Sequence, residues 1–169
     1  MVAQAAATIA LGLLGASGVA KLVDPEPTTG AMRAARLPAS NLLSRFLATV
    51  EIAVAAVALS VGGSTVLGAA ILYAGFAVFT FGAITRRVPL QSCGCFGRED
   101  TPPTSLHIAF NLVAGLALFS LPILGHDPVD WTLPAVELGL YGGFTLAGVV
   151  ASYLLLTRLP QLMRLVGTR

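Results

Sequence analysis

Two cysteines separated by one glycine are the only thiols in the chain, and they are the residues best suited to covalent chemistry. The motif reads Cys93-Gly94-Cys95-Phe96-Gly97. The backbone freedom of glycine allows two such close thiols to form a disulfide through a small, constrained ring. A strained disulfide is reduced more easily than a relaxed structural one. Phe96 and Gly97 would offer a partner chain an apolar face, so the motif favours reversible thiol–disulfide exchange.

Two other interpretations of the cysteine pair stay open. Thiolates bind thiophilic ions, so Cys93 and Cys95 are also candidate metal or metalloid ligands, with His107 as the only nearby further ligand. In the third interpretation the two cysteines are an inert part of the structure.

His107 and Asn111 stand four positions apart, so on a helix they share one face. Both follow the cysteine motif after a short loop. An imidazole near a thiol can take its proton, and the thiolate is the species that attacks a disulfide. His107 is therefore a candidate base or thiolate partner, supported by Asn111. The alternative is an interfacial histidine bonded to backbone carbonyls.

Glu51 is a carboxylate near the middle of the apolar stretch Leu42–Val61. Ionisable groups inside a membrane are costly and indicate function by default. Lys21 and Arg45 lie toward one end of the neighbouring apolar segments, and either could supply a cation to Glu51. The carboxylate is then a proton acceptor or gate beneath the cysteines, or the partner in an ion pair that locks two helices.

Long apolar segments must position these residues. The 169-residue chain is 56% hydrophobic and 11% charged, with a mean hydropathy of +0.84. Soluble domains carry about 25% charged residues, so the composition excludes an ordinary soluble enzyme, a disordered protein and a nucleic-acid binder. A membrane-spanning helix needs about 20 apolar residues. Five segments meet this length: Val2–Val23, Leu42–Val61, Thr65–Thr85, Ser105–Leu124 and Leu133–Thr157.

The sequence therefore predicts one all-α integral membrane domain over residues 1–169, a bundle of five transmembrane helices in the lipid bilayer. Small residues allow helices to approach closely in lipid. Small residues recur at every fourth position in two places: Gly139 and Gly143, and the row Gly12, Ala16 and Ala20. We interpret both as packing within the bundle, with a homo-oligomer interface as the alternative. Met32–Leu37 is predicted to form a short helix along the membrane surface.

The charges predict the orientation. Five spans place all ten basic residues on the face that holds the C-terminus: Lys21, Arg33, Arg36, Arg45, Arg86, Arg87, Arg98, Arg158, Arg164 and Arg169. Because cytoplasmic loops are enriched in Lys and Arg, we expect the N-terminus outside, and the C-terminus and the cysteine loop on the cytoplasmic side of the cell membrane.

The chain resembles the methylamine-utilisation MauE family, within the DoxX-like group of small four- to five-helix membrane proteins. The matching pieces are Gly18-Val19-Ala20-Lys21-Leu22 followed by Asp24-Pro25, then Glu51, then Cys93-Gly94-Cys95-Phe96-Gly97. The resemblance implies a four-helix core plus a C-terminal helix. It also implies thiol–disulfide chemistry in the cell envelope, with a thioredoxin-like partner.

The predicted function is a membrane thiol–disulfide redox protein. Cys93 and Cys95 would exchange electrons or disulfides with a thioredoxin-like protein or a disulfide-bearing substrate protein, with His107 and Glu51 handling protons. The alternatives are a carrier of thiophilic metal or metalloid ions and a non-catalytic assembly factor. Electron transfer across the membrane would require alternating access, a quinone or a haem; of these, a quinone is the candidate cofactor.

Overall fold

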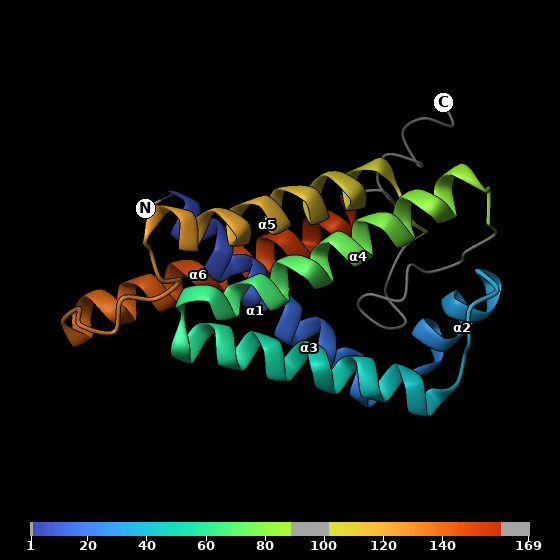
Figure 1. Ribbon diagram of the computed structural model, residues 1–169, viewed down its shortest axis with the longest axis horizontal. Coiled ribbons are helices and arrows are strands. Elements are labelled where there is room, and N and C mark those ends of the chain that lie inside the picture. The colour runs from blue at the N-terminus through green and yellow to red at the C-terminus, as the bar shows by residue number, and fades with distance from the viewer. Residues whose placement is uncertain (1, 89–101, 160–169) are drawn as a thin grey trace.

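All regular structure in the described residues, 2–88 and 102–159 of the computed structural model, is helical (Figure 1). The helices are α1 (Val2–Val23), α2 (Glu26–Ala34), α3 (Asn41–Val61), the short 3₁₀ helix η1 (Gly63–Thr65), α4 (Val66–Thr85), α5 (Ser105–Leu124) and α6 (Ala135–Thr157). Five of them are long and apolar enough to cross a membrane: α1, α3, α4 together with η1, α5 and α6. The predicted all-α class with five spanning helices is confirmed.

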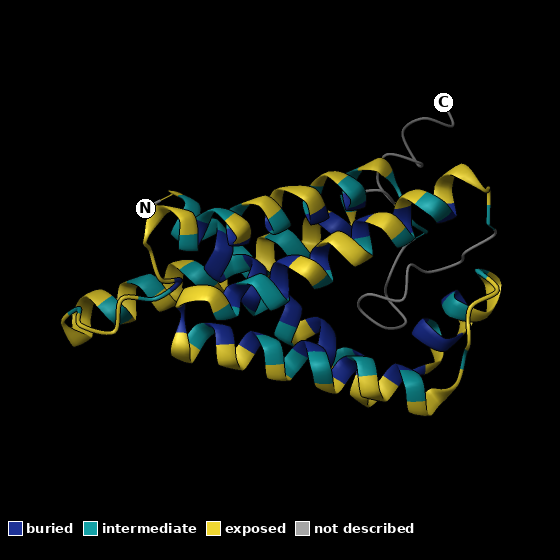
Figure 2. Ribbon diagram, in the orientation of Figure 1, coloured by how far each residue is buried: buried dark blue, intermediate teal, exposed yellow. Residues whose placement is uncertain are grey.

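Helix α1 lies at the centre of the bundle and packs against α3, α5 and α6. Helix α4 packs mainly against α5 and also against α3. The core where these helices meet is made largely of small and aliphatic side chains, including Ala7, Leu11 and Leu118. Figure 2 shows that the outward faces of the helices are exposed. Those faces carry large apolar side chains such as Ile71 and Val78, as expected of surfaces that face lipid.

The helix between α1 and α3 begins earlier than predicted. Helix α2 covers Glu26–Ala34, with Pro27 in its first turn, a position where the missing N–H of proline costs nothing. It ends before Arg36, whose φ of 59° lies in the left-handed region. The prediction of a helix over Met32–Leu37 is therefore wrong in its bounds.

Helix α6 lies at the edge of the bundle and packs on α1 at Gly12, one of the predicted small residues, and at Gly148, which was not predicted. A Cβ on Gly12 of α1 would lie 2.7 Å from Val149 of α6, and one on Gly148 would overlap Ile9. Gly139 and Gly143 have open space where a Cβ would stand. Our interpretation of that pair as a packing contact within the bundle is wrong.

The bundle is closed at one end by the loop between α5 and α6. The Asp127 carboxylate accepts a hydrogen bond of 2.7 Å from the Gly63 backbone N–H, and the positive φ of Gly62 shapes the turn beneath it. Trp131 donates to the Leu59 carbonyl at 3.2 Å. At the opposite end, α1 and α4 finish, α3 and α5 begin, and α2 lies beside them (Figure 1). The polar residues singled out above gather near that end.

Candidate functional site

A buried ion pair joins α1 to α3. The Lys21 ammonium lies 2.7 and 2.8 Å from the two carboxylate oxygens of Glu51. It also donates to the Ser17 hydroxyl at 2.7 Å, and Ser17 donates to Glu51 at 3.2 Å. Lys21 is 2% exposed and Glu51 is fully buried. Each charge is thus satisfied by the other and by one hydroxyl, which is the condition for keeping charges inside an apolar bundle.

The sequence of α1 explains this geometry. Ser17 and Lys21 are four residues apart and therefore share a face of the helix. Gly18 lies between them, and a Cβ there would stand 2.8 Å from the Ala48 carbonyl and 3.3 Å from the Glu51 Cβ. The missing side chain lets α3 approach close enough for Glu51 to reach Lys21. Phe76 of α4 covers the ammonium, with its ring centroid 5.2 Å from Nζ.

Of the two cations proposed for Glu51, the structure selects Lys21. Arg45 is exposed near the start of α3, and the only ion pair found among residues 2–88 and 102–159 is that of Lys21 with Glu51.

His107 lies in the first turn of α5 and is fixed by the residue that caps the helix. The backbone N–H of Thr104 donates to Nδ1 at 3.3 Å, and the Thr104 hydroxyl is 3.0 Å from the same atom. A backbone N–H can only donate, so Nδ1 must be an acceptor. The neutral ring then carries its proton on Nε2, and Nε2 is buried.

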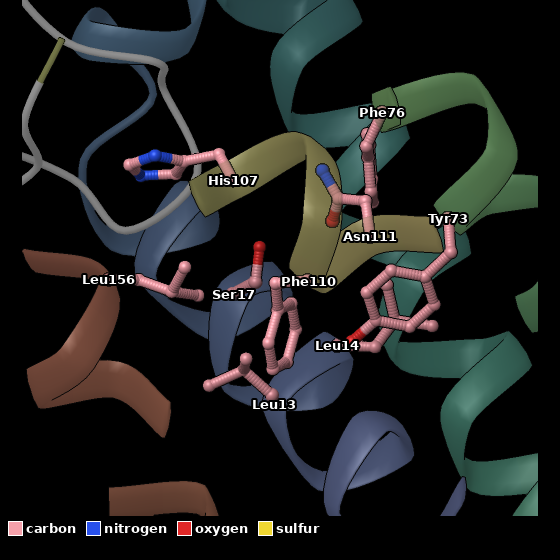
Figure 3. Close-up of a pocket in the computed structure, with 9 residues that line it drawn as sticks. All are labelled: Leu13, Leu14, Ser17, Tyr73, Phe76, His107, Phe110, Asn111 and Leu156. Carbon is pink, nitrogen blue, oxygen red and sulfur yellow. The ribbon is translucent and has the colours of Figure 1, made fainter. Parts of the chain in front are cut away.

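His107 and Asn111 share one face of α5, as predicted, and both line a small cavity between α1, α4, α5 and α6 (Figure 3). Its volume is about 30 Å³, and its wall also includes Ser17. The rest of the wall is mostly apolar or aromatic: Leu13, Leu14, Tyr73, Phe76, Phe110 and Leu156. The cavity thus lies between His107 of α5 and Ser17 of α1, which is hydrogen-bonded to Lys21 and Glu51.

The cysteine motif itself, with Cys93, Gly94, Cys95 and Phe96, lies outside the described residues. The metal-site alternative of both cysteines with His107 falls outside with it. Within the described part of the chain, no three His, Cys, Asp or Glu side chains are grouped so that they could hold a metal ion.

Sequence reasoning missed Ser17, Tyr73 and Phe76. A signal for Ser17 was present, because it lies four residues before Lys21 on the same helix face. Tyr73, whose hydroxyl donates to the Ala10 carbonyl at 2.7 Å, and Phe76 come from α4. Their place beside α1 depends on how the helices pack, so no local pattern indicates it.

The model of a family described as "Methylamine utilisation protein MauE" matches residues 1–125, which include α1 to α5 and exclude α6. No curated protein and no solved structure matches the chain.

Proposed function

The chain belongs to the MauE family, and from this premise we propose that it is a membrane thiol–disulfide exchange protein whose reacting groups are Cys93 and Cys95. The observation that carries the proposal is the position of His107. Val88 lies three residues after the end of α4, Pro102 lies three residues before the start of α5, and His107 lies in the first turn of α5. The five spanning helices make the chain a multi-pass membrane protein.

The geometry of His107 supports one of its two predicted roles. With Nδ1 accepting from Thr104, the neutral ring offers an N–H at Nε2 and not a basic lone pair. Such a group donates a hydrogen bond to a thiolate and stabilises it, whereas a general base would need an unprotonated nitrogen facing the thiol. His107 is therefore proposed as the thiolate partner of the cysteine pair.

The exchange reaction follows from thiol chemistry. One cysteine thiolate attacks a disulfide of the partner protein, forming a mixed disulfide and releasing one partner thiolate. The second cysteine then attacks the mixed disulfide, which leaves a Cys93–Cys95 disulfide and a second partner thiol. Two electrons pass to the partner, and the reverse sequence oxidises it. The proposed partner is a thioredoxin-like protein or a disulfide-bearing substrate protein.

In this proposal the Lys21–Glu51 pair supports the site. It ties the end of α1 to α3, next to the cavity on which His107 lies. The description of the family points to methylamine utilisation, so we place the chain as a membrane accessory protein of that process. The distribution of basic residues supports a proposed orientation with the cysteine loop on the cytoplasmic side of the cell membrane.

The test is to trap thiols in intact cells and in isolated membranes with an alkylating reagent that adds mass, with and without mild reductant. We expect that, in a fraction of the molecules, Cys93 and Cys95 become labelled only after reduction. Of the single variants Cys93→Ser and Cys95→Ser, the one that lacks the second cysteine should accumulate a mixed disulfide that runs as a larger, reductant-sensitive species. The one that lacks the attacking cysteine should form none.

Two outcomes would overturn the proposal. Thiols that are always reduced, and that are blocked until a chelator is added, would assign the pair to a thiophilic ion. A Cys93→Ser, Cys95→Ser double variant that keeps full function would make the loop a non-catalytic docking element.

A further inference from the structure

Helices α2 and α4 end in the same kind of turn, and each turn has an arginine where glycine is usual. Arg36 follows α2 with a φ of 59°, and Arg87 follows α4 with a φ of 50°. In both turns the backbone N–H of the arginine donates to the carbonyl three positions back, and that of the next residue donates to the carbonyl five positions back. This is the Schellman motif, whose residue of positive φ is usually glycine.

The turn after α5, at the opposite end of the bundle, repeats the motif with Gly125, whose φ is 67°. Glycine adopts this conformation without steric cost, whereas a residue with a Cβ is strained there. A cation also complements the end of a helix dipole, but Arg33 in the last turn of α2 and Arg86 at the end of α4 already provide one. The strain at Arg36 and Arg87 therefore indicates a task for their side chains.

The two turns lie beside one contact between α2 and α4. Ala31 of α2 and Ala83 of α4 are buried against each other, and both helices finish at this end of the bundle (Figure 1). Four exposed arginines follow these two alanines along the chain: Arg33, Arg36, Arg86 and Arg87. Within residues 2–88 and 102–159 no carboxylate forms an ion pair with them. The junction of α2 and α4 thus carries four guanidinium groups that the described part of the chain does not neutralise.

The position of this junction selects the anion. A guanidinium group forms two parallel hydrogen bonds to a phosphate group. Arg86 and Arg87 come directly after a helix that is long and apolar enough to span a membrane, so they lie at the depth of lipid headgroups. One and two turns before them, Phe81 and Val78 are exposed on α4, where acyl chains would pack. A phosphate beside apolar chains is the chemistry of a phospholipid and not of a soluble anion.

We propose that the junction of α2 and α4 binds the headgroup of an anionic phospholipid, with the Arg36 and Arg87 side chains as its main phosphate ligands. Arg33 and Arg86 add positive charge to the same site. Since a hydrogen bond of 2.8 Å between Thr29 and Ser44 already holds α2 to α3, the lipid would tie α2 to the end of α4 as well. The site does not depend on the proposed thiol chemistry.

The experiment is a titration of the purified full chain in mixed micelles with fluorescently labelled phosphatidylglycerol, followed by fluorescence anisotropy. The wild type should bind this lipid more tightly than labelled phosphatidylcholine, which has no net charge. Arg36→Gly, Arg87→Gly should weaken phosphatidylglycerol binding by at least about tenfold, because hydrogen bonds to a charged group are lost. Glycine suits the positive φ of both turns, so this variant should keep its fold, which circular dichroism checks.

Arg45→Ala is the matched control for the single variant Arg87→Gly. Arg45 is an exposed arginine near the start of α3, at the same end of the bundle but outside both turns. Its loss should change the affinity by about twofold at most, as expected of one solvated charge. Arg87→Gly should have a clearly larger effect.

Unchanged affinity in Arg36→Gly, Arg87→Gly would overturn the lipid site. Equal losses in Arg45→Ala and Arg87→Gly would overturn it too, because the attraction would then come from the overall charge of this end. Displacement of the labelled lipid by an equal concentration of inorganic phosphate would also contradict the proposal, since it would assign the arginines to a soluble anion.

Discussion

At the scale of single residues, the contact between Lys21 and Glu51 holds two charges inside an apolar bundle. Two charges removed from water are tolerated because the ammonium bonds both carboxylate oxygens and Ser17. Removing one partner leaves the other charge buried without compensation, whereas removing both leaves an apolar contact. The pair is therefore expected to respond very differently to single and double substitution.

Lys21→Met should destabilise the protein by about 3–5 kcal/mol, the usual cost of breaking a buried ion pair. The double variant Lys21→Met, Glu51→Leu should recover most of that loss. Unfolding of the purified protein in mixed micelles, followed by circular dichroism against denaturant, measures both. If the double variant is as unstable as the single one, Lys21 and Glu51 are not energetically coupled.

His107 is the residue on which the proposed chemistry depends. His107→Ala should slow alkylation of the reduced cysteines at neutral pH by about tenfold, which corresponds to the loss of one hydrogen bond to a charged group. The rate is measured with iodoacetamide in nanodiscs and quantified by mass spectrometry. His126→Ala is the matched control, since this exposed histidine lies just after α5, at its other end. An unchanged rate in His107→Ala would remove the histidine from the site.

At the scale of elements, the contact of α1 with α3 positions the polar cluster, and Gly18 permits that contact. A Cβ at Gly18 would meet a backbone carbonyl at 2.8 Å, and a backbone atom cannot move aside as the end of a side chain can. Most of the other helix glycines do not have this constraint. Gly75 of α4, for example, has open space at its Cβ position.

Gly18→Ala should therefore destabilise the protein by about 1–3 kcal/mol, the cost of overpacking a well-packed contact. Gly75→Ala should be neutral or stabilise by up to about 1 kcal/mol, because alanine favours a helix more than glycine does. The same unfolding assay in micelles measures both variants. Equal effects of the two substitutions would show that α1 and α3 do not meet as closely at Gly18 as the structure has them.

At the scale of the whole molecule, the loop between α5 and α6 and the segment containing α2 lie at opposite ends of the bundle (Figure 1). The basic side chains in the described residues are at the α2 end, among them Lys21, Arg36 and Arg86. The Asp127 loop at the other end carries no basic residue. This asymmetry leads to a prediction about the orientation in the membrane.

Single cysteines introduced into the Cys93→Ser, Cys95→Ser background should report the two faces. Ser64→Cys, in the turn between α3 and α4, should react in intact cells with a maleimide that cannot cross membranes. Arg36→Cys, after α2, should react only once the cells are opened. The reverse pattern would invert the orientation proposed from the charges.

The sequence alone was enough to predict the long helices and the pairing of His107 with Asn111 on one face. Both depend on local properties: a span is recognised by its own length and hydropathy, and residues four apart on a helix always share a face. The existence of an intramembrane carboxylate with a cation nearby was equally readable, since Glu51 is conspicuous in an apolar stretch.

Only the tertiary structure decided which residues meet. It selected Lys21 over Arg45 for Glu51 and brought Ser17, Tyr73 and Phe76 to the same place. Of the small residues predicted to pack, it put Gly12 against α6 and left Gly139 and Gly143 without a contact. In a bundle whose helices are apolar on every side, hydropathy does not indicate which face turns inward. The rotation of each helix is set by close packing and by the few polar groups that must find partners, and these conditions exist only once the helices have assembled.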